Sequence, residues 1–331
     1  MEIRQGNPCY ICLLKTQLRM SCKITLVEHQ RRKADLHAAS RLLFVALCAA
    51  VVSGISAPSS QSHPVRIGYC AQLSEIDATK AAGFDYVELR TSEVAALSQA
   101  DFEKLADKLK RIALPVPDAY QFIPGNIKLT GPQADQALQH DYVQKALDRV
   151  SKLGARTVVL GSGTARQYPD GFSKEAALRQ FAEFCKWLGP EARKRNITIA
   201  IEPLRKEESN LINTLAEGLQ FVKSVGDPNI QLNVDYYHLE MEKEDPAVIL
   251  QARDYVRHVH TANPQGRVFP LNWEEYNYAP FYSALRKIGY DKEVSIEART
   301  DDFPREAPQA IAFLRRAFLA EDFDTSHSQT R

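Results

Sequence analysis

Four short apolar runs in the second half of the chain each end in a side chain that can bind a metal ion or move a proton. The runs are ITIAIE, QLNVD, VRHVH and EVSIE, and their last residues are Glu202, Asp235, His260 and Glu297. Carboxylate oxygens and an imidazole nitrogen form a hard-to-borderline donor set for Mn²⁺, Mg²⁺, Co²⁺ or Zn²⁺. A carboxylate also serves as a general base or acid. The set predicts a site for one divalent metal ion.

The segments between these runs have helical spacing, for example residues 214–225 and 280–288. Alternating strands and helices are typical of a parallel sheet. In a closed (β/α)8 barrel, the C-terminal strand ends meet at one mouth. The first half repeats the pattern, with strands expected at 65–70, 85–90, 115–122 and 156–160. Helices are expected there at 76–82, 101–112, 134–153 and 173–195, and a closing helix at 308–318.

The fold class predicted by this alternation is α/β, a single-domain (β/α)8 TIM barrel over residues 65–320. The alternative is a doubly wound open sheet, which requires a glycine-rich phosphate loop after the first strand. The sequence there is Tyr69-Cys70-Ala71-Gln72. The barrel is therefore the better interpretation.

Side-chain alternation in the strands predicts which residues face the mouth. Thr198, Ala200 and Glu202 share one face of their run, and an acid buried there is costly without a partner. His238 follows Asp235 by three residues, which places both near the same mouth.

Two histidines share one face of the VRHVH run, because side chains two apart in a strand point the same way. We expect His260 to face the metal, and His258 to be a structural histidine bonded to a neighbouring strand. Glu88, on the second expected strand, is a further acid that we expect to point into the mouth.

The first 57 residues have the pattern of a leader segment. Arg31-Arg32-Lys33 and Arg41 precede the apolar run LLFVALCAAVV at 42–52, and small residues follow. A basic stretch, a short apolar run and then small residues at a cleavage site are typical of a secretory signal. Roughly 20 apolar residues are needed to span a bilayer. We therefore expect an exported protein, periplasmic or secreted, with no stable membrane span in its mature form. Residues 58–64 are the expected linker, and 321–331 the disordered tail.

The charge distribution argues against a nucleic-acid partner. The formal net charge is +1, but the excess of basic residues falls within positions 1–63, so the remainder is mildly acidic. A mildly acidic body gives no electrostatic support for binding a phosphate backbone. Only two of the six cysteines, Cys70 and Cys185, lie outside the leader, so no disulfide framework is predicted.

Residues 65–319 resemble the sugar isomerase/epimerase family with a xylose-isomerase-like barrel, which includes D-tagatose 3-epimerase, hydroxypyruvate isomerase and endonuclease IV. The resemblance is carried by the motifs GFDYVEL, GSGTAR, ITIAIEPL, NLINT, DYYHLEMEKEDP, HVHTANPQGR and IGYDKEVSIE. It implies that the four run-ending residues are the metal ligands. It also implies that Glu208 and His238 contact substrate hydroxyl groups and that Arg267 binds substrate.

The chemistry leaves two enzymatic readings open. One is a metal-dependent isomerase or epimerase of a small sugar or hydroxy-ketone. In it Glu202 and Glu297 transfer a proton on the two faces of a carbon through an enediolate, which a Lewis-acidic ion stabilises. The other is a lyase or dehydratase of a keto-sugar or keto-inositol on the same site, which begins with the same proton abstraction.

Two further function classes are disfavoured, and one property stays undecided. An endonuclease of abasic DNA in this superfamily uses a histidine-rich three-metal cluster. The histidines of the predicted barrel are only these four: His140, His238, His258 and His260. A non-enzymatic sugar-binding protein would not need both catalytic glutamates. The sequence leaves a homo-oligomer open.

Overall fold

Residues 65–319 are described by the computed structural model of the chain. The leader expected at 1–57, the linker expected at 58–64 and the tail expected at 321–331 lie outside the described residues.

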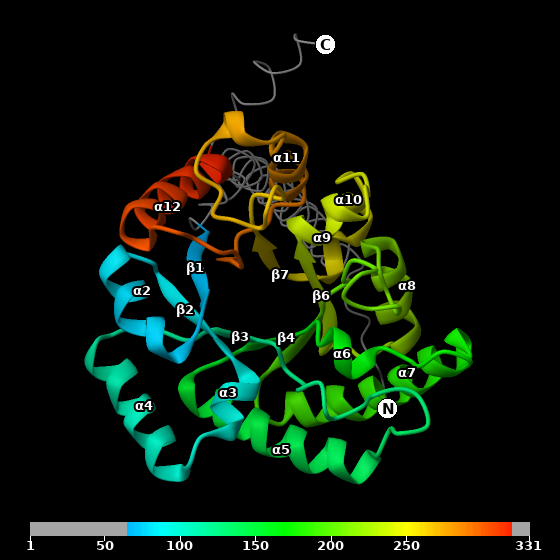
Figure 1. The fold of residues 1–331 in the computed structure, drawn as a ribbon. Coiled ribbons are helices and arrows are strands. Elements are labelled where there is room, and N and C mark those ends of the chain that lie inside the picture. The colour runs from blue at the N-terminus through cyan, green and yellow to red at the C-terminus, as the bar shows by residue number, and fades with distance from the viewer. Residues whose placement is uncertain (1–64, 320–331) are drawn as a thin grey trace, which may run out of the picture. The chain divides into compact units, whose positions relative to one another are not determined.

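Eight parallel strands close into a barrel, and they pair in the order in which they follow one another along the chain (Figure 1). They are β1 (Arg66–Ala71), β2 (Tyr86–Arg90), β3 (Asp118–Tyr120), β4 (Thr157–Leu160), β5 (Thr198–Ile201), β6 (Ile230–Asp235), β7 (Val256–Thr261) and β8 (Glu293–Ile296). β8 returns to β1 with Glu293 opposite Arg66. The predicted (β/α)8 barrel is confirmed, and the open-sheet alternative is wrong.

Helices surround the strands on the outside (Figure 1). They are α2 (Ile76–Ala82), α3 (Thr91–Ala96), α4 (Gln99–Arg111), α5 (Gln136–Leu153), α6 (Gly163–Arg166), α7 (Lys174–Arg193), α8 (Leu215–Val225), α9 (Tyr236–Met241), α10 (Val248–Ala252), α11 (Ala279–Lys287) and α12 (Phe303–Leu319). Short 3₁₀ turns occur at Leu73–Glu75, Arg253–Tyr255 and Trp273–Glu275.

Local capping explains where the long helices begin and end. The Ser98 hydroxyl accepts a hydrogen bond from the Asp101 amide at 3.1 Å, so α4 begins just after Ser98, two residues before the expected start. Gly154 ends α5 with a left-handed φ of +110°. A residue with a side chain is strained in that conformation, whereas glycine is not.

Two expected elements had wrong boundaries, and one segment expected as a loop contains a helix. The third strand is confined to Asp118–Tyr120, because the prolines that flank it cannot donate to a sheet. The closing helix begins at Phe303, five residues before the expected start at Pro308. Pro304 lies in its first turn, where a missing N–H leaves no helical bond unmade. The segment 161–172, expected as a loop, contains α6.

The barrel interior is filled with side chains below the C-terminal strand ends. A Cβ on Gly68 would overlap the ring of Tyr86, so that ring occupies the space beside β1. The Tyr86 hydroxyl lies 2.8 Å from the Ser295 hydroxyl across the interior. The C-terminal mouth is therefore the end of the barrel left for a site.

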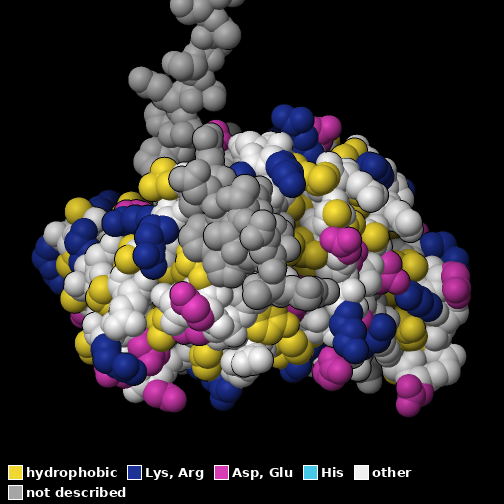
Figure 2. All heavy atoms as spheres, turned by 90° about the horizontal axis from the view of Figure 1, so that it is seen from above, with side chains coloured by type: hydrophobic (Ala, Val, Ile, Leu, Met, Phe, Trp, Pro, Cys, Tyr) yellow, Lys and Arg dark blue, Asp and Glu magenta, His cyan; other side chains and the backbone are white. Residues whose placement is uncertain are grey.

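Charges of both signs are mixed on the face drawn in Figure 2, outside the grey atoms, and neither sign forms a continuous patch there. No helix among residues 65–319 is long and apolar enough to cross a bilayer.

Candidate metal centre and active site

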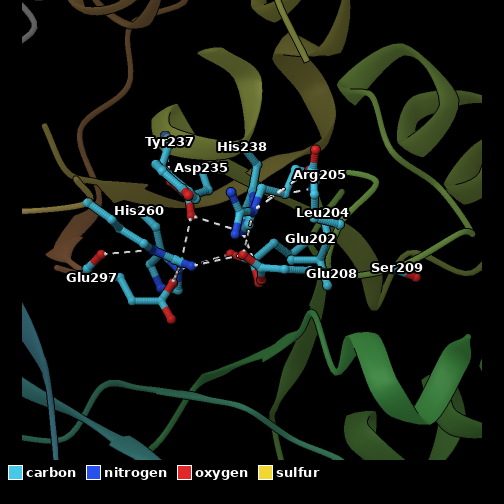
Figure 3. Close-up of polar contacts among 12 residues, drawn as sticks. Glu202, Leu204, Arg205, Glu208, Ser209, Asp235, Tyr237, His238, His260 and Glu297 are labelled. Atoms are coloured by element: carbon cyan, nitrogen blue, oxygen red, sulfur yellow. Dashed lines mark hydrogen bonds and ion pairs between the residues drawn. The ribbon is translucent and has the colours of Figure 1, made fainter. Parts of the chain in front are cut away.

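The four predicted ligands converge at the C-terminal ends of the last four strands (Figure 3). Glu202 and Glu297 follow β5 and β8 directly, Asp235 is the last residue of β6, and His260 lies near the end of β7. One ligand atom from each of the four lies within 4.8 Å of the others. The strand-and-helix repeat thus gathers one donor from each of four consecutive strands.

Each of these side chains keeps at least one donor atom turned toward the others. The Nδ1 atom of His260 lies 3.1 Å from Glu202 Oε1 and 3.2 Å from Glu297 Oε2. Asp235 caps α9 by accepting the Tyr237 amide on Oδ1 at 2.9 Å, which leaves its Oδ2 for the cluster. The ligand positions are therefore set by the backbone elements that carry them.

The charges in the cluster fit a divalent cation. The pKa of Asp235 is raised to about 7. Burial is the largest cause, the carboxylates of Glu202 and Glu297 add to it, and the Arg267 guanidinium opposes it. Carboxylates forced this close repel one another unless a cation offsets their charge. Three carboxylate groups and one imidazole are also a donor set that such an ion accepts.

Glu202 is held by two neighbours that the sequence analysis did not single out. The side-chain amide of Asn233 donates to Glu202 Oε1 at 2.8 Å. On the other side, a Cβ on Gly161 would overlap Glu202 Oε2, so only glycine leaves room for the carboxylate. Asn233 shares its strand face with Asp235, and the alternation of QLNVD could have identified it. Nothing in the sequence signals the Gly161 contact.

A cavity of about 440 Å³ opens beside the cluster. The predicted site residues on its wall are Glu202, Glu208, His238, Arg267 and Glu297. The buried Asp235 and His260 complete the set. On other parts of the wall lie the polar residues Ser92, Gln121, Ser162 and Thr164. The structure therefore brings all seven predicted site residues to one mouth.

His238 presents a hydrogen-bond donor to this cavity. Its Nδ1 accepts the backbone N–H of Arg205 at 3.2 Å, so in the neutral ring the proton is on Nε2. Burial, with the charge of Arg267, lowers the pKa of His238 to about 3, so the ring is neutral at pH 7. Among residues 65–319, no partner forms a hydrogen bond with this Nε2, and Asp235 Oδ2 lies 3.5 Å from it.

Arg267 links the carboxylates at the mouth. Its guanidinium lies 2.9 Å from Glu297 Oε2 and 3.4 Å from both Asp235 Oδ2 and Glu208 Oε1. The guanidinium carbon also lies 4.6 Å from the ring centroid of Tyr237. Burial by itself raises the pKa of Glu297, but Arg267 and His260 outweigh burial and lower it to about 2.

Two expectations about the second acid and the second histidine need correction. Glu88 lies in the barrel interior below the mouth, fully buried, and does not line the cavity. His258 is a buried structural histidine, but it bonds to Glu88 of β2 across the barrel, at 2.8 Å, and not to a neighbouring strand. The alternation of side chains predicts the strand face on which a residue lies. It does not predict how deep in the barrel the side chain lies or which strand opposes it.

Comparison with known proteins agrees with this architecture. The L-ribulose 3-epimerase of Mesorhizobium japonicum is 29% identical over 239 residues, which cover 69% of this chain and 75% of the relative. The 3-dehydro-D-guloside 4-epimerase of Escherichia coli is 22% identical over 259 residues, which cover 73% of this chain and 94% of the relative. A crystal structure of D-psicose 3-epimerase in the presence of D-fructose superposes with a TM-score of 0.68. It is 21% identical, covers 77% of this chain and 100% of that chain, and supports the fold.

The family model described as xylose isomerase-like TIM barrel matches residues 76–317, which include every predicted site residue. The chain therefore belongs to the family of xylose isomerase-like TIM barrels.

Proposed function

We propose that this protein is a divalent-metal-dependent sugar epimerase or isomerase. The observation that carries the proposal is the convergence of two glutamates, Glu202 and Glu297, on one cluster with Asp235 and His260 at the barrel mouth. Relatives over two thirds or more of the chain are named as sugar epimerases, which supports this class of reaction.

Glu202, Asp235, His260 and Glu297 would hold the ion. When bound, it would supply a Lewis acid to the carbonyl and the adjacent hydroxyl oxygen of the substrate, which lowers the cost of removing the neighbouring proton.

The two glutamates would transfer that proton. They follow β5 and β8, which are separated in the ring by β6 and β7, so a carbon held between them would meet a carboxylate on each face. The depressed pKa of Glu297 keeps its carboxylate ionised at neutral pH, which is the form that can accept a proton. One glutamate takes the α-proton, which leaves an enediolate, and the other returns a proton on the opposite face.

The cavity wall would hold a polyhydroxylated substrate. The Nε2–H of His238 can donate to a sugar oxygen, and the Glu208 carboxylate can accept from a hydroxyl group. Ser92, Gln121 and Ser162 add polar groups elsewhere on the wall. We infer from the expected export signal that the substrate is a free sugar, a sugar acid or an oxidised glycoside, because sugar phosphates are scarce outside the cytoplasm.

The proposal is tested by incubating the protein with candidate ketoses and keto-glycosides in D₂O. We expect an epimer or isomer that carries deuterium at the α-carbon, and loss of the reaction after EDTA treatment. An unsaturated, dehydrated product would instead assign the lyase or dehydratase reading. Full activity in metal-free protein would contradict the proposal.

A further inference from the structure

Glu88 is a buried carboxylate directly beneath the cluster that the proposed mechanism does not use. Its side chain is fully inaccessible to solvent. Glu88 Oε1 and Oε2 lie 3.1 Å and 3.2 Å from His260 Nε2, and Oε2 also lies 2.8 Å from His258 Nε2. One carboxylate therefore contacts two imidazole rings at different depths of the barrel.

We propose that Glu88 is a positioning residue that keeps the His260 proton on Nε2 and thereby reserves Nδ1 for the metal ion. The inference rests on the proposed metal site. It is independent of which sugar reacts there.

The geometry of His260 supports this role. Its two ring nitrogens face opposite ways, with Nδ1 toward Glu202 and Glu297 and Nε2 toward Glu88. A neutral imidazole has one N–H and one lone pair, and a partner that accepts at Nε2 leaves the lone pair on Nδ1. A carboxylate on the far nitrogen of a metal-binding histidine fixes both the tautomer and the orientation of the ring. Cys70 Sγ, 3.7 Å from Nε2, is a much weaker alternative acceptor.

A glutamine at position 88 could not replace the carboxylate. Both oxygens of Glu88 are within 3.2 Å of His260 Nε2. Either orientation of an amide would therefore place its NH₂ group against that nitrogen. That NH₂ group would oppose the Nε2–H donor even though the amide oxygen can still accept from it. The conflict is removed only if His260 moves its proton to Nδ1 and gives up the lone pair that binds the ion.

A purely structural role for Glu88 makes a different prediction. The same buried network contains Asp118, whose Oδ2 lies 3.7 Å from His258 Nδ1, and no contact joins Asp118 to His260 among the described residues. If Glu88 only balanced charge inside the barrel, removing the charge of Glu88 or of Asp118 would lower stability. The two variants would then bind the metal ion with similar affinity. Asp118→Asn is thus the matched control.

The test is a calorimetric titration of Mn²⁺ into EDTA-stripped full-length protein, wild type and both variants, with melting curves recorded in EDTA. We expect Glu88→Gln to raise the Kd for Mn²⁺ by about 10- to 100-fold, the range found for such outer partners. Asp118→Asn should change the Kd much less, because Asp118 contacts His258 and not a predicted metal ligand. Equal Kd values for wild type and Glu88→Gln would overturn the inference, whereas a wild type that binds no Mn²⁺ would overturn the proposed function itself.

A second measurement does not use Glu88→Gln, so it remains decisive if that variant does not fold. In wild-type protein labelled with ¹⁵N-histidine and loaded with Zn²⁺, His260 should show a protonated Nε2 and a metal-bound Nδ1 in long-range ¹H–¹⁵N spectra. The signal is assigned by its loss in His260→Gln. Coordination through Nε2 would overturn the inference and leave the metal site intact.

Discussion

Gly161 and Glu202 lie so close that a Cβ on residue 161 would overlap Oε2 of the carboxylate. The same loop approaches a second site residue, because a Cβ on Gly163 would overlap the backbone oxygen of Glu208. Arg166, at the end of α6, is fully buried, and its guanidinium reaches the Ile212 carbonyl at 3.4 Å. The GSGTAR segment after β4 therefore forms the wall against which the acids of the next loop are held.

This contact predicts the effect of Gly161→Ala. The added methyl group should push the Glu202 carboxylate aside, and misplacement of a catalytic group by about 1 Å can cost on the order of 10²-fold in rate. We expect kcat to fall by about that factor while the melting temperature changes little. Gly125→Ala is the control, because its Cβ would meet only the side chain of Thr164, at 3.0 Å. Equal losses in both variants would show that the cavity wall tolerates no added volume at all.

The proposed metal site predicts the effects of a second set of variants. Asp235→Asn and His260→Ala each remove a donor from the four-residue cluster, so both should bind Mn²⁺ much more weakly and lose activity in proportion. Excess Mn²⁺ should restore part of the activity of Asp235→Asn, because an amide oxygen can still coordinate. Metal analysis of the dialysed proteins checks the stoichiometry, for which we expect one ion per chain in the wild type.

The pKa of His238 predicts how stability depends on pH. This pKa is lowered to about 3 in the folded protein, against an ordinary value of 6.5. Between these values only the unfolded chain binds the proton, so the contribution of His238 to stability is complete above pH 6.5 and is lost as the pH falls toward 3. In this pH range, His238 alone changes the free energy of unfolding by about 1.4 kcal/mol per pH unit.

Urea unfolding of metal-free protein between pH 4.5 and 7 measures that slope. His238→Gln should lose less stability than the wild type as the pH falls through this window, because glutamine does not titrate. Parallel curves for the two proteins would show that His238 is protonated in the folded state as well.

The sequence predicts the position of a side chain well where the pattern of one strand is enough to define it. Alternation in ITIAIE and QLNVD gives the inward faces of Glu202 and Asp235, and the repeat of strand and helix places their ends at one mouth. The long helices were also predicted within a few residues, because Ser98 and Gly154 are local signals that need no tertiary context.

The contacts that the sequence did not predict depend on which strands oppose one another across the barrel. Glu88 meets His258 and His260 from 170 and 172 residues away in sequence, and no local pattern encodes that distance in space. The short helices α6 and α9 lie at strand ends where tertiary packing outweighs weak local propensity. Their sequences carry too few residues for a reliable helical period.

The export signal stays a prediction, because residues 1–57 lie outside the described part of the chain. We expect the leader to be removed when the protein is made in its native host, on the basis of the basic stretch and the apolar run at 42–52. N-terminal sequencing of protein from the periplasm or medium should give a mature chain that begins near residue 57. A chain that keeps its leader and stays in the cytoplasm would contradict both the export and the inference of an unphosphorylated substrate.

The last prediction separates proton transfer from metal binding. Glu202→Gln and Glu297→Gln keep the shape of the side chain and one oxygen that can coordinate, so each variant should retain weakened metal binding. A general base contributes roughly 10²–10⁴-fold, and we expect each variant to lose at least that much in kcat.

Deuterium exchange then identifies the two faces. If each glutamate serves one face, a variant should wash deuterium into the α-carbon from one epimer only, and the other variant should do so from the opposite epimer. Equal loss from both epimers in both variants would indicate a collapsed site, which metal content would reveal. Normal turnover in a metal-loaded Glu297→Gln protein would exclude it as a base. A water molecule or His238 would then have to carry the second proton.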